Sequence, residues 1–156
     1  PASFTGALAR RLNQACNIKV VELAEPERLE PGTVYIGRGD GDVVVERKAG
    51  RIMAGPRPSE PDYLWHPSVD RMVRSALEHI APEQLVGVLM TGMGNDGASA
   101  MALLRARGGR TIAEAEETAV VWGMPGAAAH AGICAAVLPL NQIGPKLVRV
   151  FSGDRS

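Results

Sequence analysis

A glycine-rich loop that carries a carboxylate is the stretch of this sequence best suited to chemistry. Residues 91–98 read Thr-Gly-Met-Gly-Asn-Asp-Gly-Ala, between an apolar run and an alanine-rich stretch. The loop glycines permit positive φ and close backbone approach, so the chain can turn sharply and present its N–H groups. Asp96 lies just before a predicted helix, and a carboxylate near a helix N-terminus is favoured in its ionised form. Asp96 is therefore the first candidate site residue.

Three hypotheses fit this loop. Asp96, fixed at the edge of a sheet, can orient a catalytic histidine and stabilise its imidazolium. It can instead cap the following helix, which is a common role of aspartate. Gly92–Gly97 also matches the dinucleotide-binding pattern G-x-G-x-x-G, with Glu114 as the ribose-binding acid. The third hypothesis is disfavoured because Asp96 would compete with a pyrophosphate of the same charge for one group of amides.

The surrounding elements predict an α/β fold. The run at 86–90 is typical of a strand buried on both faces of a parallel sheet, and 98–107 is typical of a helix. The alternation of strands with helices implies a doubly wound, mainly parallel sheet with right-handed crossovers. A small antiparallel hairpin is expected over 42–54. Further strands are expected at 18–23, 33–36, 110–113 and 133–138, the last of them buried, and further helices at 4–15, 69–80, 125–131 and 139–151, with Gly144 and Pro145 confining the last to its later turns.

The composition restricts the class of protein. With 156 residues, of which 46% are hydrophobic, the chain is predicted to form a single domain with a sizeable core. Its 17 basic residues balance 17 acidic ones without a long charged block, which disfavours nucleic-acid binding. No apolar run approaches the roughly 20 residues of a membrane span and no signal-type segment opens the chain, so we expect a cytoplasmic protein without membrane insertion. Cys16 and Cys134 lack metal or redox spacing and are interpreted as buried or idle thiols.

The proline-rich segment 55–67 offers a second place to look for chemistry. Its proline density predicts a stiff surface loop, since proline fits neither a helix interior nor a central strand. His66 lies near its end and is the histidine that we single out for a site role. Ser68 is predicted to cap the helix at 69–80, whose charged side chains, Arg71 among them, are interpreted as a solvated face.

The remaining nucleophiles and bases do not complete a site. The sequence contains no G-x-S-x-G pattern, and its serines look like caps or lack a glycine-rich setting. His79 and His130 lie late in predicted helices, where a favourable interaction with the helix C-terminus is the simpler interpretation. The residues alone therefore supply a carboxylate and backbone donors, without a convincing nucleophile or base.

Four motifs together resemble the catalytic domain of the bacterial chemotaxis protein-glutamate methylesterase, the CheB family. They lie collinearly at residues 31–37, 65–70, 91–98 and 119–125. The resemblance implies a Ser-His-Asp hydrolase whose aspartate is Asp96, with the backbone N–H of Met93 in the oxyanion hole. The alternative interpretation of Met93 is ordinary core packing of its side chain.

The resemblance also sets expectations for substrate and partners. It implies hydrolysis of glutamate methyl esters on the cytoplasmic helices of methyl-accepting chemoreceptors, with release of methanol, and deamidation of receptor glutamines in many members. It requires neither metal nor cofactor. The family's serine and histidine would precede Pro1, as would its phosphorylatable receiver domain, so we expect an N-terminally incomplete catalytic domain. A catalytically inactive receptor-binding module is the alternative.

Overall fold

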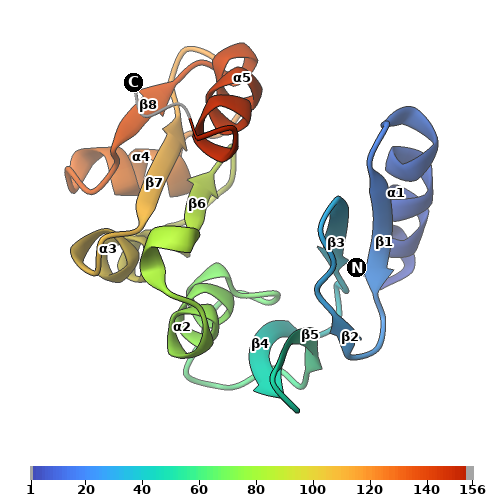
Figure 1. The fold of residues 1–156 in the computed structure, drawn as a ribbon. Coiled ribbons are helices and arrows are strands. Elements are labelled where there is room, and N and C mark those ends of the chain that lie inside the picture. The colour runs from blue at the N-terminus through green and yellow to red at the C-terminus, as the bar shows by residue number, and fades with distance from the viewer. Residues whose placement is uncertain (1, 154–156) are drawn as a thin grey trace. The chain divides into compact units, whose positions relative to one another are not determined.

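The computed structural model describes residues 2–153, and the chain divides into two compact units, with the boundary in the sequence between Ile80 and Ala81 (Figure 1). The first unit contains two small sheets and the second unit contains one, and each unit has its own buried apolar residues. The prediction of a single domain concerns the two units together and stays a prediction. The α/β class is confirmed, with parallel sheets and one antiparallel sheet.

The first unit opens with a helix packed on a parallel strand pair. Helix α1 (Ala2–Ala15) contacts strands β1 (Lys19–Leu23) and β3 (Thr33–Gly37), as Figure 1 shows at the blue end of the chain. The strands are in register from Lys19 opposite Thr33 to Leu23 opposite Gly37. Val20 and Leu23 are buried, and because they are three residues apart their side chains point to opposite faces of the strand pair, so each face of β1 has a buried residue.

The rest of the first unit is an antiparallel sheet with the order β2–β5–β4, covered by a helix. Its strands are β2 (Glu27–Arg28), β4 (Asp42–Lys48) and β5 (Arg51–Arg57), and helix α2 (Val69–His79) contacts β4. Strand β5 continues through Pro56, so the prediction that the proline-rich loop begins at residue 55 is wrong. Proline is tolerated there because β2 pairs only as far as Ala54, which leaves one side of β5 without a neighbour at Pro56.

The second unit is a parallel α/β layer. After a short 3₁₀ turn (Pro82–Gln84) come β6 (Val86–Leu89), α3 (Ala98–Ala106), β7 (Arg110–Glu114), α4 (Met124–His130), β8 (Ala136–Leu138) and α5 (Leu140–Phe151). Each strand pairs with the next one in sequence, in the order β6–β7–β8 across the sheet. Right-handed crossovers in the same direction place α3 and α4 on one face of the sheet, where the two helices contact each other. Leu89, Leu104 and Ile112 are among the buried residues that join sheet and helices.

Two predictions for the end of the chain are wrong. The strand predicted at 133–138 is only three residues long and lies at the sheet edge, with Val137 44% exposed, because none of the strands within residues 2–153 pairs with its outer side. Helix α5 runs continuously from Leu140 through Pro145 instead of being confined to its later turns. Pro145 lies early in the helix and its position is exposed, so solvent can reach the backbone around it.

Candidate active site

Two loops meet at the carboxyl edge of the β6–β7–β8 sheet. Residues 90–97 follow β6, and residues 115–123 follow β7. Because β6 and β7 are parallel, both end at the same edge, which is where open α/β sheets place ligand sites. A parallel bridge between Gly92 and Trp122 continues the pairing into the loops. The glycine-rich loop therefore lies where the sequence predicts it.

Backbone hydrogen bonds hold the two loops together. The Gly92 N–H donates to the Val121 carbonyl over 2.9 Å, and the Gly92 carbonyl accepts from the N–H groups of Gly123 and Met124 at 3.1 and 2.8 Å. Thr91 adds a side-chain bond, since its Oγ1 accepts from the Val121 N–H at 2.8 Å. The approach is close enough that a Cβ on Gly123 would lie 2.7 Å from the Gly92 oxygen. Glycine at position 123 is therefore a packing requirement.

Asp96 lies at the end of the first loop, next to the N-terminus of α3. Asp96 is only 8% exposed to solvent. The N-cap position belongs to Gly97, whose φ of 89° lies in the left-handed region that favours glycine, and α3 starts at Ala98. The largely buried carboxylate of Asp96 thus adjoins the N-terminus of α3. The predicted placement of Asp96 at a helix N-terminus is confirmed, whereas its catalytic role stays a prediction.

Met93 presents its backbone to the site and its side chain to solvent. The side chain is 70% exposed, so the interpretation as core packing is wrong. Within residues 2–153, no protein acceptor is hydrogen-bonded to the Met93 N–H. Gly94 follows with a φ of 86°, which turns the chain sharply after this amide. The amide is therefore available to a negatively charged oxygen.

Glu114 occupies the end of β7 and faces inward. It is 1% exposed. Its Oε2 accepts from the Thr91 N–H at 2.8 Å, and its Oε1 accepts from the Thr118 hydroxyl at 3.0 Å. Because this carboxylate is buried and bonded within the protein, the structure disfavours Glu114 as the ribose-binding acid of the nucleotide-binding hypothesis.

Exposed apolar side chains surround the two loops. Met90 and Met93 belong to the first loop, and Val120 and Val121 belong to the second. We call these four residues the apolar rim. Exposed apolar groups gathered around a candidate site are typical of surfaces that contact another macromolecule.

A second polar cluster lies in the first unit, around the buried Asp42. Its carboxylate accepts from the Ser68 N–H and from Arg71 Nη1, both at 2.8 Å, and lies 3.0 Å from His66 Nδ1. Arg71 also donates to the Pro58 carbonyl and pairs with Glu60. The interpretation of Arg71 as part of a solvated face is therefore wrong, because its guanidinium links α2 to the buried Asp42 and to the first half of the proline-rich loop.

Electrostatics fix the proton arrangement of this cluster. Burial raises the pKa of Asp42, but hydrogen bonds from Arg71, His66 and the Ser68 amide outweigh it and hold the pKa below its usual 3.8. An ionised carboxylate only accepts, so His66 donates from Nδ1, and in the neutral imidazole Nε2 is then the acceptor. His66 is thus oriented by Asp42, a partner that no local pattern in the sequence indicated.

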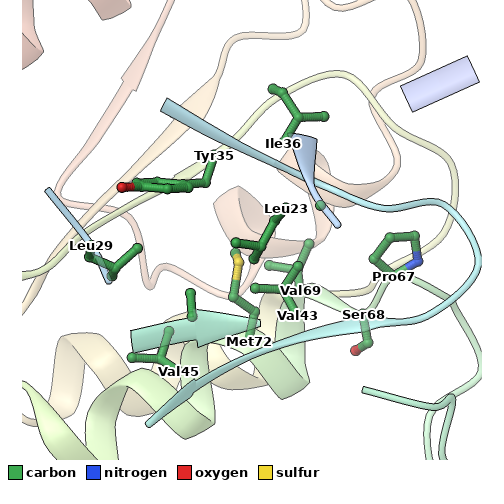
Figure 2. Close-up of a pocket in the computed structure, with 12 residues that line it drawn as sticks. Leu23, Leu29, Tyr35, Ile36, Val43, Val45, Pro67, Ser68, Val69 and Met72 are labelled. Atoms are coloured by element: carbon green, nitrogen blue, oxygen red, sulfur yellow. The ribbon is translucent and has the colours of Figure 1, made fainter. Parts of the chain in front are cut away.

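An apolar cavity of about 390 Å³ lies beside this cluster in the first unit (Figure 2). Figure 2 shows Val43, Val69 and Met72 pointing into it, with Tyr35 and Leu29 on another side. Its lining contains no acid, base or thiol that could act near neutral pH. The cavity therefore cannot carry out acid–base chemistry, and the loops after β6 and β7 remain the candidate active site.

The other candidate residues have structural surroundings. His79 lies at the end of α2, where its carbonyl accepts from Arg47, and the His130 ring meets the Trp122 ring edge-on at 5.1 Å. Cys16 is an exposed free thiol, which leaves the idle alternative of its interpretation, and burial raises the pKa of the half-buried Cys134 thiol. Among the described side chains, no three His, Cys, Asp or Glu residues lie together as metal ligands would. None of the helices in residues 2–153 is both long and apolar enough to span a membrane.

Comparison with known proteins places this geometry in a family. The family model described as CheB methylesterase matches residues 1–147. The chain is 56% identical over 154 residues to the protein-glutamate methylesterase/protein-glutamine glutaminase 2 of Rhodopseudomonas palustris (strain BisB18), covering 99% of this chain and 42% of that protein. It is 50% identical over 147 residues to the corresponding protein 3 of Rhodospirillum rubrum, covering 94% of this chain and 40% of that protein. The chain thus spans about two fifths of these relatives.

A solved structure matches at the level of the fold. The crystal structure of the Thermotoga maritima CheB methylesterase catalytic domain superposes with a TM-score of 0.90 at 33% sequence identity. The match covers 96% of this chain and 79% of that chain. The fold class predicted from the alternation of strands and helices agrees with this neighbour.

Proposed function

The chain belongs to the CheB methylesterase family. From that premise we propose that it supplies the triad aspartate of a protein-glutamate methylesterase and one hydrogen-bond donor of the oxyanion hole. The reaction is hydrolysis of glutamate methyl esters on chemoreceptors to glutamate and methanol. Deamidation of receptor glutamines is included in the proposal, because the relatives' names also carry protein-glutamine glutaminase.

One observation carries the proposal. A single short loop holds both the largely buried carboxylate of Asp96, beside a helix N-terminus, and the Met93 amide, which has no protein acceptor among residues 2–153. Acyl transfer needs a fixed negative charge behind a histidine and a donor aimed at the developing oxyanion. The loop offers both groups within four residues of sequence.

The proposed mechanism has two acyl-transfer steps. A serine attacks the ester carbonyl while a histidine takes its proton, and methanol leaves with that proton; water then releases the glutamate by the same route. In this proposal Asp96 is the triad residue that the chain supplies. Asp96 orients the histidine and offsets its charge, and the Met93 N–H donates to the carbonyl oxygen as it becomes negative, which contributes about 3 kcal/mol per donor.

The apolar rim supports a macromolecular substrate. Met90, Met93, Val120 and Val121 surround the proposed reaction centre with side chains suited to the surface of a receptor helix. We extend the proposal to the cytoplasmic helices of methyl-accepting chemoreceptors as substrate and to a regulatory receiver domain as intramolecular partner. Because the proposed receptor helices are cytoplasmic, the proposal includes a cytoplasmic location for the protein.

The test is methanol release from methylated receptor by the full-length protein. The proposal predicts receptor-dependent release that saturates with receptor concentration, and ammonia release from receptors that carry glutamine at the same positions. Receptor association without methanol or ammonia would overturn the enzymatic proposal and favour the receptor-binding module. Unmethylated receptor serves as the control for background methanol.

A further inference from the structure

Glu114 is a buried acid that the proposed mechanism does not use. It ends β7, one residue before the second site loop, and is 1% exposed. Both of its carboxylate oxygens accept hydrogen bonds within the second unit, from the Thr91 N–H and the Thr118 hydroxyl. Its backbone carbonyl accepts from Trp122 Nε1 at 2.9 Å. One residue therefore contacts both site loops.

These bonds reach a third element through Thr118. Its Oγ1, besides donating to Glu114, accepts from the Leu140 N–H at 3.0 Å, at the first residue of α5. We call Thr91, Glu114, Thr118, Trp122 and Leu140 the Glu114 network. It connects the start of the glycine-rich loop to β7, to the second loop and to α5.

The point of attachment is what gives the network a functional consequence. Thr91 is the second residue after β6 and the second residue before Met93, whose amide is the proposed oxyanion donor. The Glu114 carboxylate holds the Thr91 amide at 2.8 Å, and the bridge between Gly92 and Trp122 fixes the next residue. The direction of the Met93 N–H is thus set by two consecutive residues that Glu114 and the second loop restrain.

We propose that Glu114 is a positioning residue, which aims the Met93 amide at the oxyanion by holding Thr91 and the second site loop in place. The inference rests on the proposed function. Glu114 contacts no reacting atom and acts through the loop. A misplacement of about 1 Å at a reaction centre can cost on the order of 100-fold in rate, so this restraint affects turnover more than binding.

The choice of replacement separates geometry from charge. Glu114→Gln keeps the length of the side chain, and its amide can accept from the Thr91 N–H and donate to Thr118 Oγ1. Glu114→Ala removes both bonds. The proposal therefore predicts rescue by glutamine, with kcat of Glu114→Gln within about threefold of wild type, and a kcat that falls about 10- to 100-fold in Glu114→Ala with KM changed less than threefold.

Thr111→Val is the matched control. Thr111 lies on the same strand, is equally buried at 1% exposed, and its hydroxyl donates to the Ile133 carbonyl and accepts from the Ala135 N–H. That pair of bonds lies toward the other end of β7. The control should lose stability as Glu114→Ala does, yet keep kcat within about twofold of wild type, because it leaves the site loops untouched.

The experiment measures methanol release by the full-length variants and amide hydrogen exchange at residues 91–93. Faster exchange at those amides in Glu114→Ala, but not in Thr111→Val, supports the inference. Equal behaviour of these two variants overturns it, as does a glutamine variant that is as impaired as the alanine variant. If Glu114→Ala does not fold, Thr118→Val takes its place. For this variant we expect faster amide exchange at residues 91–93 and a smaller loss of kcat than for Glu114→Ala. Wild-type exchange together with wild-type kcat would overturn the inference.

The two claims fail in different ways. Absence of methanol release from wild type rejects the proposed function, while the exchange measurement still decides whether Glu114 restrains the loop. Methanol release with unchanged exchange and kcat in the Glu114 variants rejects only the positioning role.

Discussion

Replacing Gly123 with alanine should impair turnover through a clash that the structure defines. Gly123 has φ and ψ of −77° and −71°, which any residue can adopt, so the substitution adds no backbone strain of its own. The new Cβ would instead lie 2.7 Å from the Gly92 carbonyl oxygen and 2.9 Å from the N and O atoms of Gly94. All three are backbone atoms on either side of Met93 and cannot rotate away.

The required movement sets the expected magnitude. The Gly92 oxygen must retreat to at least 3.0 Å, and to 3.4 Å for an ordinary contact. The displacement acts on both neighbours of Met93 and stretches the bonds that the Gly92 carbonyl accepts from Gly123 and Met124. A shift of this size predicts a kcat about 10- to 100-fold below wild type and a loss of about 1–3 kcal/mol in the free energy of unfolding.

Gly144→Ala provides the matched control for this prediction. A Cβ at Gly144, which lies in α5, meets nothing within 4 Å. The same chemical change should stabilise the fold by roughly 0.4–1 kcal/mol and leave kcat unchanged. The assay is methanol release by the full-length protein together with urea unfolding. A Gly123→Ala variant with kcat within about twofold of wild type would refute the argument that the second loop fixes the Met93 amide.

Three further predictions concern the first unit and the thiols. Because the pKa of Asp42 is lowered in the folded protein, its ionisation stabilises the fold above its ordinary value of 3.8 and this contribution is lost as the pH falls through the folded pKa. Asp42→Asn should therefore lower the free energy of unfolding by about 3 kcal/mol at neutral pH. Urea unfolding across pH should show that the difference in unfolding free energy between wild type and variant becomes smaller as the pH falls below 3.8. A difference that does not change with pH would contradict the prediction. Ser68→Ala removes the side chain that accepts from the Arg71 N–H at the start of α2, and should cost about 1 kcal/mol by the same measurement, with no loss counting against the cap. A neutral thiol reagent should modify the exposed Cys16 before the half-buried Cys134, whose pKa is raised, as mass spectrometry of partly modified protein would show; the opposite order would contradict the assigned exposures.

Local sequence patterns predicted the elements that position the site. The apolar run at 86–90 and the glycines after it indicated a strand, a turn and a helix in succession; the strand is observed at Val86–Leu89, and Gly94 and Gly97 do adopt positive φ. Ser68 was recognisable as a cap because its side chain bonds only three residues along the chain. Patterns of this kind depend on neighbours in sequence, which is why they can be read without a structure.

The partners of the buried acids could not be predicted in the same way. Asp42 meets His66 and Arg71 across 24 and 29 residues, and Glu114 meets Thr91 across 23. The periodicity of the sequence carries no information on such contacts. Glu114 was therefore considered as a ribose-binding acid, and Arg71 was interpreted as part of a solvated helix face. The exposed edge of β8 is a similar case, because its apolar composition is that of a buried strand and only the sheet order decides which strand lies at the edge.

The central claim is that Asp96 is the acid of a methylesterase triad, and the most direct test is kcat for methanol release by full-length Asp96→Asn. Asparagine preserves the size of the side chain but cannot stabilise an imidazolium, so the account predicts a loss of about 10³- to 10⁴-fold with an unfolding midpoint close to wild type. Asp62→Asn, at an exposed carboxylate in the proline-rich loop, should be unaffected. Near-normal turnover by a folded Asp96→Asn protein would contradict the assignment.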